Sequence, residues 1–526
     1  MSGVFKNFVE LKKNYLLLIV FVVILLLSQF MLQYRATLWP KLYILIVLAA
    51  GILILFFSRL NDPKKIARNA FVLIAFLGVA NSFILPIRQN LDENTHYYHA
   101  LQISDGNLRI QATEKNFLMI SPDFLAVTKL PSKPEYGNDL NTNLYYKDFL
   151  DLKNIPSNYK SEYVDVGNFN NPAYIPSALG IKFGQLISDK LFVSYYMGRI
   201  FNLIFYALLV YLAIKISKRY KIQLFVLGTI PYTLWISAGY SYDSLYYGLV
   251  LLILAQFTNF MGETESITVR RILYYSLTCF LLVFCKAPMV LLAVLPLFLP
   301  KHFFKSTKTY LSSFFIIGTS GFFGFLWMQQ NAILTKLGFI TQKVVEKNTA
   351  DSELASRLNY FATHPSYAAG VVLRSLSDIP ATIMDSVQSP QPYLMKSETL
   401  SFINLVVFLL LIIIISLLFH NIVPKSIYLS ISAIFIVITF AVFYAISGDT
   451  RVFSLGDLSV AGVQGRYHFY ILTFLPLFLA PKLKSILNLS RKGTIDLDEE
   501  RLVLLIFKLV FITTWINTCV ALFGYL

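Results

Sequence analysis

The chain has 526 residues, of which 56% are hydrophobic and only 14% are charged. Soluble globular proteins carry about 25% charged residues, so the composition excludes an ordinary soluble protein and indicates an integral membrane protein. The formal net charge of +16 points first to membrane topology rather than to a nucleic-acid partner, because Lys and Arg gather on the cytoplasmic side of membrane helices.

Apolar runs close to the length that crosses a bilayer, about 20 residues, recur along the chain. They predict an all-α membrane protein with about thirteen transmembrane helices. The runs lie at residues 14–31, 42–58, 70–88, 192–214, 222–239, 244–260, 272–285, 288–300, 310–328, 402–419, 426–445, 467–480 and 503–523. The first run follows a basic start but is too long for the apolar part of a signal peptide, so we expect a retained helix.

The polar segments between these runs differ in charge. If successive helices alternate in direction, one set of segments holds 22 Lys and Arg, whereas the short loops of the other set hold five: Arg35, Lys41, Lys286, Arg451 and Arg466. By the positive-inside rule, the first set is cytoplasmic. We therefore expect a bacterial cytoplasmic membrane protein with a cytoplasmic N-terminus and an external C-terminus.

Two polar segments are too long to be simple connections, and both fall on the external side of this topology. The first contains turn-rich and helix-like pieces, and we expect it to form an α-rich loop domain between the third and fourth helices. The chain then divides into an N-terminal membrane region with three helices, the loop domain, a membrane core, a second external loop and a C-terminal membrane region, at residues 1–88, 89–191, 192–328, 329–401 and 402–526.

The loop domain opens with a cluster of titratable side chains, Asp92, Glu93, His96 and His99. On a helix that starts after Asn90, Asp92, His96 and His99 would share one face. This arrangement suits a general base at a membrane edge, and the same three side chains could hold a divalent metal. In the structural alternative, Asp92 caps the helix, Glu93 favours its N-terminal dipole and the histidines are solvated.

Further polar residues lie at the ends of apolar runs on the same side. Tyr242 and Asp243 stand between two runs, where Asp243 could shape a site or simply cap a helix, and tyrosine is common at membrane interfaces. Lys286 is a lone cation between two short runs. Such a residue marks a functional site by default, here one for a lipid phosphate, although it could also extend to the surface.

The stretch GVQGRYHFY places Gln464 and Arg466 directly before another apolar run. The guanidinium fork matches phosphate geometry, and flanking glycines let the backbone approach a ligand; a surface anchor is the alternative. Arg199 has a similar position in its own run. Acids next to cations in this way suit glycosyl transfer from a lipid-phosphate sugar, with a base near a hydroxyl and cations near a phosphate.

The order of these motifs resembles that of a bacterial membrane family called domain of unknown function twenty-one forty-two, over about Arg88 to Pro481. The resemblance rests on the stretches DENTHYYHALQISDGNL, YYMGRIFNLIFYALLVYLAIK, PYTLWISAGYSYDSLYYG, KAPMVLL and GVQGRYHFY. That family is similar to the GT-C glycosyltransferases. The similarity implies a large external loop that begins with an acidic motif, a polyprenyl-phosphate-sugar donor, and a catalytic or acceptor-orienting role for Asp92 and Glu93.

We therefore expect a membrane glycosyltransferase that moves a sugar from a polyprenyl phosphate to a cell-surface glycan or wall polymer, with membrane lipids but no nucleic acid as further partners. Asp92 or Glu93 would be the base, and His96 would orient it. The phosphate and the acceptor would be bound by Lys286, Arg466, Gln464, Asp243, Arg199 and Tyr242. The alternatives are a transporter or flippase for lipid-linked glycans and a non-catalytic scaffold of a wall-polysaccharide complex.

Overall fold

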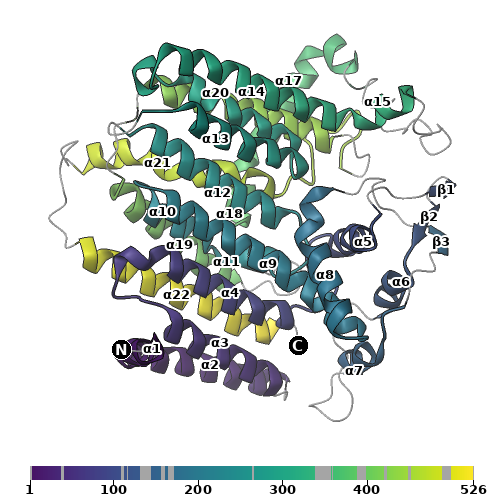
Figure 1. The fold of residues 1–526 in the computed structure, drawn as a ribbon, viewed down its shortest axis with the longest axis vertical. Coiled ribbons are helices and arrows are strands. Elements are labelled where there is room, and N and C mark those ends of the chain that lie inside the picture. Colours follow the sequence, from purple (N-terminus) through teal and green to yellow (C-terminus); the bar gives the residue numbers. More distant parts are fainter. Residues whose placement is uncertain are drawn as a thin grey trace.

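The structure is a computed structural model, and most of its helices lie side by side in one bundle (Figure 1). The smaller elements of the 89–191 segment lie at one end of this bundle, on the right in Figure 1. The structure describes residues 3–36, 41–107, 112–114, 117–130, 144–155, 160–163, 171–262, 266–337, 357, 359–387, 398–419, 423, 425–447, 452–487 and 499–524.

The bundle is built from helices whose sequences are apolar over most of their length, because a backbone in lipid must satisfy its own hydrogen bonds. These helices are α1 (Gly3–Lys13), α2 (Tyr15–Ala36), α3 (Lys41–Phe57), α4 (Ile66–Ile84), α9 (Leu191–Ile216), α10 (Lys221–Gly228), α11 (Pro231–Ser237), α12 (Asp243–Phe260), α13 (Val269–Leu281), α14 (Thr307–Met328), α19 (Glu398–Leu417), α20 (Lys425–Ile446), α21 (Phe469–Ile486) and α22 (Glu499–Gly524). Short 3-10 helices join or extend them: η1 (Pro63–Lys65), η3 (Leu282–Phe284), η4 (Ala287–Phe298), η5 (Lys301–Phe303) and η7 (Gly465–His468).

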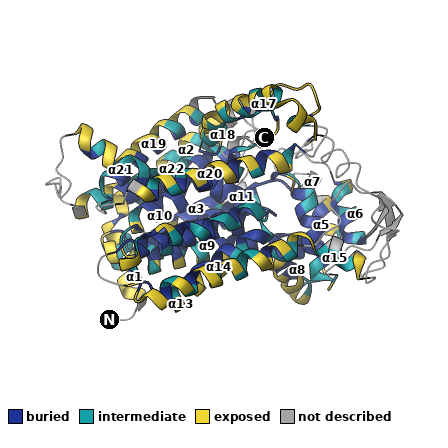
Figure 2. Cartoon of the chain, turned by 90° about the horizontal axis from the view of Figure 1, so that it is seen from above, coloured by how far each residue is buried: buried dark blue, intermediate teal, exposed yellow. Residues whose placement is uncertain are grey.

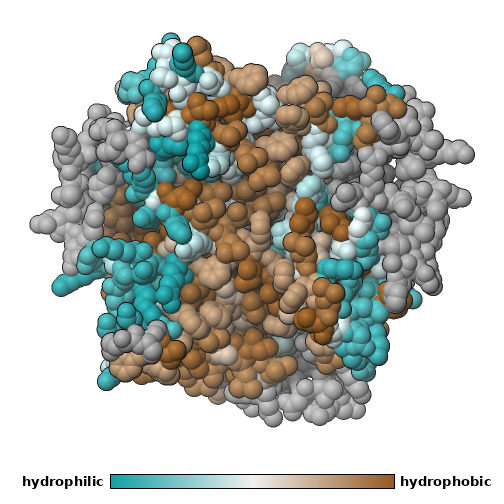
Figure 3. Space-filling view, in the orientation of Figure 1, coloured by the Kyte–Doolittle hydropathy of each residue, from teal (hydrophilic) through white to brown (hydrophobic). Residues whose placement is uncertain are grey.

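The outer helices present apolar faces. Figure 2 shows exposed outward faces on α14 and α20 around a buried interior, and these faces carry large side chains such as Phe315, which is 79% exposed, and Leu429, which is 73% exposed. Hydrophobic surface runs down the middle of the molecule in Figure 3, with hydrophilic surface on both sides of it. A protein surrounded by lipid is expected to have such a band of apolar surface between two hydrophilic surfaces.

Seven helices among the described residues are long and apolar enough to cross a membrane. They are Pro63–Ile84, Leu191–Ile216, Thr307–Met328, Leu400–Leu417, Ser426–Ile446, Gly465–Ile486 and Glu500–Leu522. The pair Val4–Lys13 and Tyr15–Met31, bent by 68°, would make an eighth, and Leu42–Phe57 and Ala287–Phe298 are shorter apolar helices. The predicted integral membrane protein is confirmed, whereas the number of about thirteen crossings stays a prediction.

One predicted membrane helix is broken, and the predicted gap between two short runs holds a charged residue. Residues 222–239 form α10 and α11, which are separated before Pro231 because proline cannot continue the preceding helix. The run 272–285 forms the end of α13 and η3, the run 288–300 forms η4, and Lys286 lies in the gap before η4. In membrane proteins, interrupted helices of this kind are tolerated where the exposed backbone lines a cavity or is buried in protein.

The 89–191 segment folds into a domain of short elements: α5 (Glu93–Ser104), α6 (Pro122–Lys129), α7 (Leu144–Asp151), η2 (Pro172–Tyr174), α8 (Ile175–Ile187) and the strands β1 (Ala112–Glu114), β2 (Phe117–Ile120) and β3 (Lys160–Tyr163). The strands form an antiparallel sheet in the order β1-β2-β3, with Phe117 opposite Tyr163. This sheet is a difference from the all-α prediction. Phe124, Val127 and Phe149 pack with Tyr195 of α9, which fixes the domain on the bundle.

The described part of the 329–401 segment contains α15 (Gln330–Lys336), α17 (Pro365–Ser377) and α18 (Ile379–Asp385). Part of this predicted second loop, 338–356 and 388–397, lies outside the described residues. Tyr367 of α17 donates a hydrogen bond to the carbonyl of Asp457, at 2.8 Å, and accepts one from the backbone N–H of Gly456. The segment therefore packs on the chain that leads to η7.

Candidate functional site

Four charged side chains from distant parts of the sequence meet where helices begin. Asp92 immediately precedes α5, Asp243 is the first residue of α12, Lys286 immediately precedes η4 and Arg466 lies in η7. Chain connections and broken helices place these residues at helix ends, where side chains and backbone groups are free to make contacts other than the helical ones. We call these four side chains the charge cluster.

The charge cluster is a continuous row of ion pairs. Lys286 Nζ lies 2.6 Å from Asp243 Oδ1, and Arg466 Nη1 lies 3.2 Å from Asp243 Oδ2. Arg466 Nη2 then lies 2.6 Å from Asp92 Oδ2. The side chains of Asp243, Arg466 and Lys286 are 0%, 3% and 6% exposed, whereas that of Asp92 is 62% exposed. The row therefore runs from a buried lysine to a carboxylate at the surface.

Tyrosine rings surround the buried lysine. Lys286 Nζ lies 4.9 Å from the ring centre of Tyr242, 5.0 Å from that of Tyr246 and 4.6 Å from that of Tyr467. Cations are attracted to the negative faces of aromatic rings at such distances. The rings and Asp243 together compensate the loss of hydration of the buried ammonium group, and Asp243 is the carboxylate that pairs with Lys286 among the described residues.

Glu93 forms a separate ion pair with Arg199. Arg199 Nε and Nη2 donate to the two Glu93 carboxylate oxygens, each at 2.8 Å, and both side chains are 0% exposed. The carboxylate also accepts the backbone N–H groups of Asn90 and Tyr240. The guanidinium further donates to the carbonyl oxygens of Ser82, Leu85 and Pro86. This pair ties α4, α5, α9 and the turn between α11 and α12 together.

These surroundings bear on two predicted roles. Every nitrogen of the Arg199 guanidinium already donates to protein oxygens, so no donor is left for a phosphate. The Glu93 carboxylate is enclosed by four donated hydrogen bonds, so it does not face an acceptor. The geometry thus places Arg199 and Glu93 apart from the charge cluster, as a structural support beside it.

The backbone explains why adjacent carboxylates point to different partners. Asp92 has a φ of 52° and a ψ of 26°, in the left-handed region, which asparagine and aspartate tolerate better than other residues with side chains. The Asn90 side chain donates to the carbonyl of Ile236 at 2.9 Å and lies so close to Gly239 that a Cβ there would come within 2.2 Å of its amide nitrogen. This contact docks the start of α5 against the end of α11.

Arg466 is positioned by a close backbone approach. A Cβ on Gly465 would lie 1.9 Å from the carbonyl oxygen of Thr382 and 2.9 Å from Cβ of Ser386. Only glycine allows η7 to lie this near to α18. The 329–401 segment therefore contributes to the site indirectly, because α18 sets the position of the backbone that carries Arg466.

His96 lies beside the charge cluster as a neutral side chain. Its Nδ1 forms a hydrogen bond with the Tyr174 hydroxyl at 2.8 Å, and its ring meets the ring of Tyr242 edge-on at 5.0 Å. Burial, followed by the positive charge of Arg466, lowers the pKa of His96 to about 3. His99 stacks on Tyr174 at 5.3 Å. The two histidines are thus arranged around one tyrosine.

The suggested metal ligands do not form a ligand set. Among the described residues, which include Asp92, His96 and His99, no group of three or more His, Cys, Asp or Glu side chains could hold a metal ion. The physical reason is that His96 and His99 turn toward Tyr174, whereas Asp92 turns toward Arg466. The three side chains therefore do not converge on one point, as a common ligand face would require.

Several buried polar atoms near the cluster have no hydrogen-bond partner among the described residues. They are Arg466 Nε, Gln464 Oε1, His96 Nε2, and both ring nitrogens of His468. Leaving such a group unpaired costs about 1–3 kcal/mol. Three of these atoms belong to Arg466, Gln464 and His96, which the sequence analysis predicts as site residues. Unpaired polar atoms of this kind are available to a ligand.

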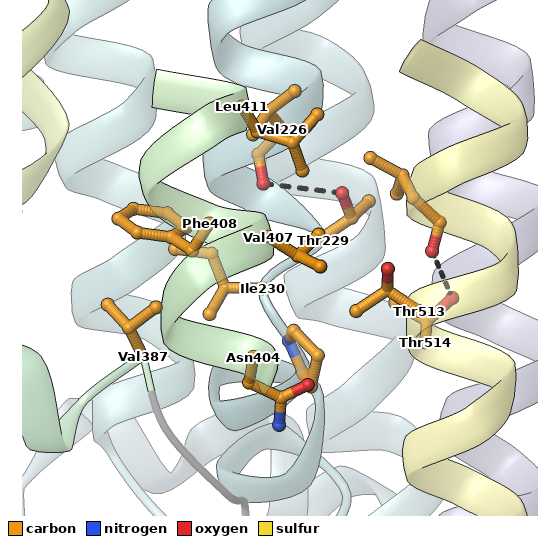
Figure 4. A pocket seen from close by; sticks show the side chains of 12 residues that line it. Val226, Thr229, Ile230, Val387, Asn404, Val407, Phe408, Leu411, Thr513 and Thr514 are labelled. Carbon is orange, nitrogen blue, oxygen red and sulfur yellow. Dashed lines mark hydrogen bonds between the residues drawn. The ribbon is translucent and has the colours of Figure 1, made fainter. Parts of the chain in front are cut away.

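A small apolar cavity lies elsewhere, at the break between α10 and α11 (Figure 4). It has a volume of about 30 Å³, and its lining includes Val226, Ile230, Phe408 and Thr514. The Thr514 hydroxyl donates to the carbonyl of Val510 at 2.8 Å (Figure 4), so its polarity is satisfied within its own helix. None of the four charge-cluster side chains lines this cavity. The cavity is therefore separate from the candidate site.

The structure thus brings Asp92, Asp243, Lys286, Arg466 and Tyr242 together and separates Glu93 with Arg199 from them. Gln464 lies two residues from Arg466 and keeps an unpaired oxygen. Sequence reasoning missed Tyr174 and Tyr246, which contact His96 and Lys286. No spacing signal marks these tyrosines, because they are two among 32 tyrosines in the chain.

Comparison with known proteins bears on the family. A family profile described as a predicted membrane protein (DUF2142) matches residues 73–477. This range contains every residue of the charge cluster. No curated protein and no solved structure matches the chain. Since the profile covers more than half of the sequence, the resemblance noted from the motifs is confirmed, and the chain belongs to the family of predicted membrane proteins DUF2142.

Proposed function

We propose that this protein is a glycosyltransferase of the bacterial cytoplasmic membrane, which moves a sugar from a polyprenyl phosphate to a hydroxyl of a cell-surface glycan or wall polymer on the external face. One observation carries the proposal. The exposed carboxylate of Asp92 lies beside the buried cation Arg466, at 2.6 Å, and Arg466 is linked through Asp243 to a second buried cation, Lys286.

This arrangement suits the charges that develop during glycosyl transfer. The acceptor oxygen forms a bond to the anomeric carbon of the donor, and the bond from that carbon to the phosphate oxygen breaks. The proton of the acceptor hydroxyl passes to Asp92, and the donor phosphodiester monoanion leaves as a phosphate monoester dianion. Fixed cations beside the leaving phosphate stabilise the added negative charge, which is the role we assign to Arg466 and Lys286.

The other residues have supporting roles in this proposal. Asp243 forms ion pairs with both cations, Lys286 and Arg466, and compensates the loss of hydration that their burial causes. Tyr242 packs against Lys286 and His96, and Gln464 offers its unpaired oxygen to a sugar hydroxyl. We assign no reacting role to Glu93 or Arg199, because their polar atoms already form hydrogen bonds with each other and with backbone groups.

The proposal is tested by measuring sugar transfer from a synthetic polyprenyl-phosphate sugar to a glycan acceptor with the full chain in detergent or vesicles. Asp92→Asn should lower the rate by about 10²–10⁴-fold, the usual contribution of a general base. Asn tolerates the left-handed backbone of this position, so the variant should fold.

Asp189→Asn is a matched control. The Asp189 carboxylate is 63% exposed and pairs with Lys153 at 2.8 Å, so it resembles Asp92 in exposure and in having a cation partner, but it lies away from the charge cluster. Its replacement should leave transfer within about twofold of the wild type. Transfer that is equal in Asp92→Asn and in Asp189→Asn would contradict the role of Asp92. Movement of intact lipid-linked sugar without transfer would favour a transporter instead.

A further inference from the structure

Asp92 and Arg466 form an ion pair with one fixed and one exposed member. The Arg466 guanidinium is 3% exposed and is held from inside by Asp243, whereas the Asp92 carboxylate is 62% exposed and reaches Arg466 through Oδ2. When the Asp92 carboxylate leaves Arg466 it is hydrated by the solvent that already covers most of it, and Arg466 keeps its ion pair with Asp243. The replaceable member of this pair is therefore Asp92.

The charges of the cluster balance only while Asp92 is in place. Lys286 and Arg466 carry two positive charges, and Asp243 and Asp92 carry two negative charges. When the Asp92 side chain leaves, the three buried side chains keep one positive charge. A phosphodiester carries one negative charge, as a carboxylate does, and both accept hydrogen bonds from a guanidinium fork. A phosphodiester thus restores the balance that Asp92 provides.

The position on Arg466 is better suited to a phosphodiester than to Asp92. The carboxylate is bonded to Nη2 alone, at 2.6 Å, and the neighbouring Arg466 Nε is buried with no hydrogen-bond partner among the described residues. Nε and Nη2 point along one edge of the guanidinium and can bind two oxygens of one phosphate. A phosphodiester can therefore make a hydrogen bond that Asp92 leaves unmade.

The backbone around Asp92 is held firmly, so an exchange requires movement of a side chain only. The preceding Arg88 donates to the carbonyl oxygens of Thr128 and Leu130 at 2.7 and 2.9 Å and to the side chain of Asn94 at 2.9 Å. These bonds fix the turn on α6 and α5. The Asp92 carboxylate can rotate away from Arg466 into the solvent that already covers most of it.

We propose that Asp92 occupies, in the ligand-free protein, the position on Arg466 that the phosphodiester of a lipid-linked donor takes, so that donor binding releases the Asp92 carboxylate to face the acceptor hydroxyl. This inference rests on the proposed function. It couples the base to the donor: one oxygen of Asp92 is held by Arg466 until a phosphodiester replaces it. It also assigns the Arg466 edge to singly charged phosphodiesters of lipids rather than to diphosphates.

The exchange is tested by binding, without any sugar transfer. The probe is methyl farnesyl phosphate, a lipid phosphodiester that carries one negative charge and no sugar, titrated into the detergent-solubilised full chain by calorimetry. Asp92→Asn removes the competing charge and should bind the probe about fivefold more tightly than the wild type, which corresponds to an exposed ion pair. Asp189→Asn should bind it as the wild type does.

Two further variants separate competition from a general effect. Arg466→Gln should lose most of the binding, and Asp92→Asn combined with Arg466→Gln should bind no better than Arg466→Gln alone, because the competition takes place on Arg466. Binding by Asp92→Asn that is equal to or weaker than that of the wild type would overturn the inference. An unchanged fivefold gain in the Arg466→Gln background would overturn it as well.

Other probes test the ligand class. Dimethyl phosphate has the same charge without the lipid chain, and farnesyl diphosphate has the chain with more charge. The inference expects weaker binding of both, and equal affinity for dimethyl phosphate and methyl farnesyl phosphate would overturn the assignment to a lipid. Tighter binding by Asp92→Asn in a protein without transfer would keep the exchange and reject the glycosyltransferase. Sugar transfer by the wild type, without tighter probe binding by Asp92→Asn, would support the glycosyltransferase and reject the exchange.

Discussion

Two ion pairs that start from adjacent residues behave in opposite ways in this protein. Glu93 and Arg199 are both 0% exposed and bind each other through two hydrogen bonds of 2.8 Å. Asp92 and Arg466 bind through one, with Asp92 at 62% exposure and Arg466 Nε unpaired. The first pair has every donor and acceptor used, and the second has both an exposed member and an unused donor.

The difference shows that hydrogen-bond satisfaction separates a structural ion pair from a candidate functional site. A buried charge pair is tolerated only when further hydrogen bonds compensate its desolvation, and the Glu93–Arg199 pair has them. Such a pair has nothing left for a ligand. The charge cluster is incompletely satisfied, which costs stability and is retained where a ligand can supply the missing partner. Residue type alone would not separate Asp92 from Glu93.

The largest effect that would sharpen this comparison comes from Glu93→Gln. The variant keeps the shape of the side chain but leaves the buried Arg199 cation without its carboxylate, which costs about 3–5 kcal/mol. We expect a large drop in the thermal midpoint of the purified protein in detergent, or loss of folded protein, together with loss of transfer. Asp92→Asn should change the midpoint little, because exposed pairs contribute about 0–1 kcal/mol.

A second variant shows whether the Glu93 effect is one of unpaired charge. Combining Glu93→Gln with Arg199→Met removes the cation as well and should recover part of the lost stability, since an apolar replacement of a buried pair is often tolerated. The comparison between the two pairs breaks down if Glu93→Gln and Asp92→Asn shift the thermal midpoint by the same small amount.

An intermediate effect is expected from Gly465→Ala. The new Cβ would meet the Thr382 carbonyl oxygen at 1.9 Å, so η7 must move away from α18 at a cost of about 1–3 kcal/mol. This shift moves Arg466 and should reduce transfer. Gly370→Ala in α17 is the matched control: its Cβ meets nothing within 4 Å, and Ala in a helix should be about 0.5–1 kcal/mol more stable than Gly. Thermal midpoints and transfer rates of both variants measure the difference.

The sequence predicted which charges gather but not how they pair. Asp243, Lys286 and Arg466 flank apolar runs, so their place at helix ends follows from the length of a membrane helix. The partner of each residue depends on contacts between positions far apart in the chain, such as Glu93 and Arg199, whose numbers differ by 106. Patterns of nearby residues carry no information on such contacts, and for this reason Glu93 was predicted as a catalytic residue and Arg199 as a phosphate-binding residue.

The fold shows the same limit. Long apolar helices such as Leu191–Ile216 were predicted close to their observed bounds. Residues 222–239 were predicted as one continuous helix, although Pro231 at the start of α11 is a signal for a break. The two short runs on either side of Lys286 were predicted as separate, and α13 with η3 and η4 are separate there. The sheet was missed because its strands have only three or four residues, too few to show an alternating pattern.

The smallest expected effect concerns a third kind of buried carboxylate, one for which the described residues provide no ion-pair partner. Asp123 of α6 is 2% exposed and accepts the backbone N–H of Ile155 at 2.8 Å. Burial raises the pKa of Asp123 to about 6, against the effect of this hydrogen bond. Because the folded domain then binds the proton more tightly than the unfolded chain does, its stability is highest below the unfolded value of about 4 and falls as the pH rises through about 6.

The loss between about pH 5 and about pH 7.5 should be modest, about 1 kcal/mol, because the range begins only about one unit below the pKa of Asp123 and one pKa unit corresponds to about 1.4 kcal/mol. The loss should be absent in Asp123→Asn, which keeps an oxygen for Ile155 and cannot ionise. Hydrogen exchange of residues 149–155, corrected for the intrinsic pH dependence of exchange and compared between about pH 5 and about pH 7.5, measures it. Equal pH dependence in the wild type and in Asp123→Asn would contradict the prediction. A difference would show that ionisation of the buried Asp123 carboxylate lowers the stability of this domain. Glu93 is buried in the same domain, but its charge is compensated by the cation Arg199.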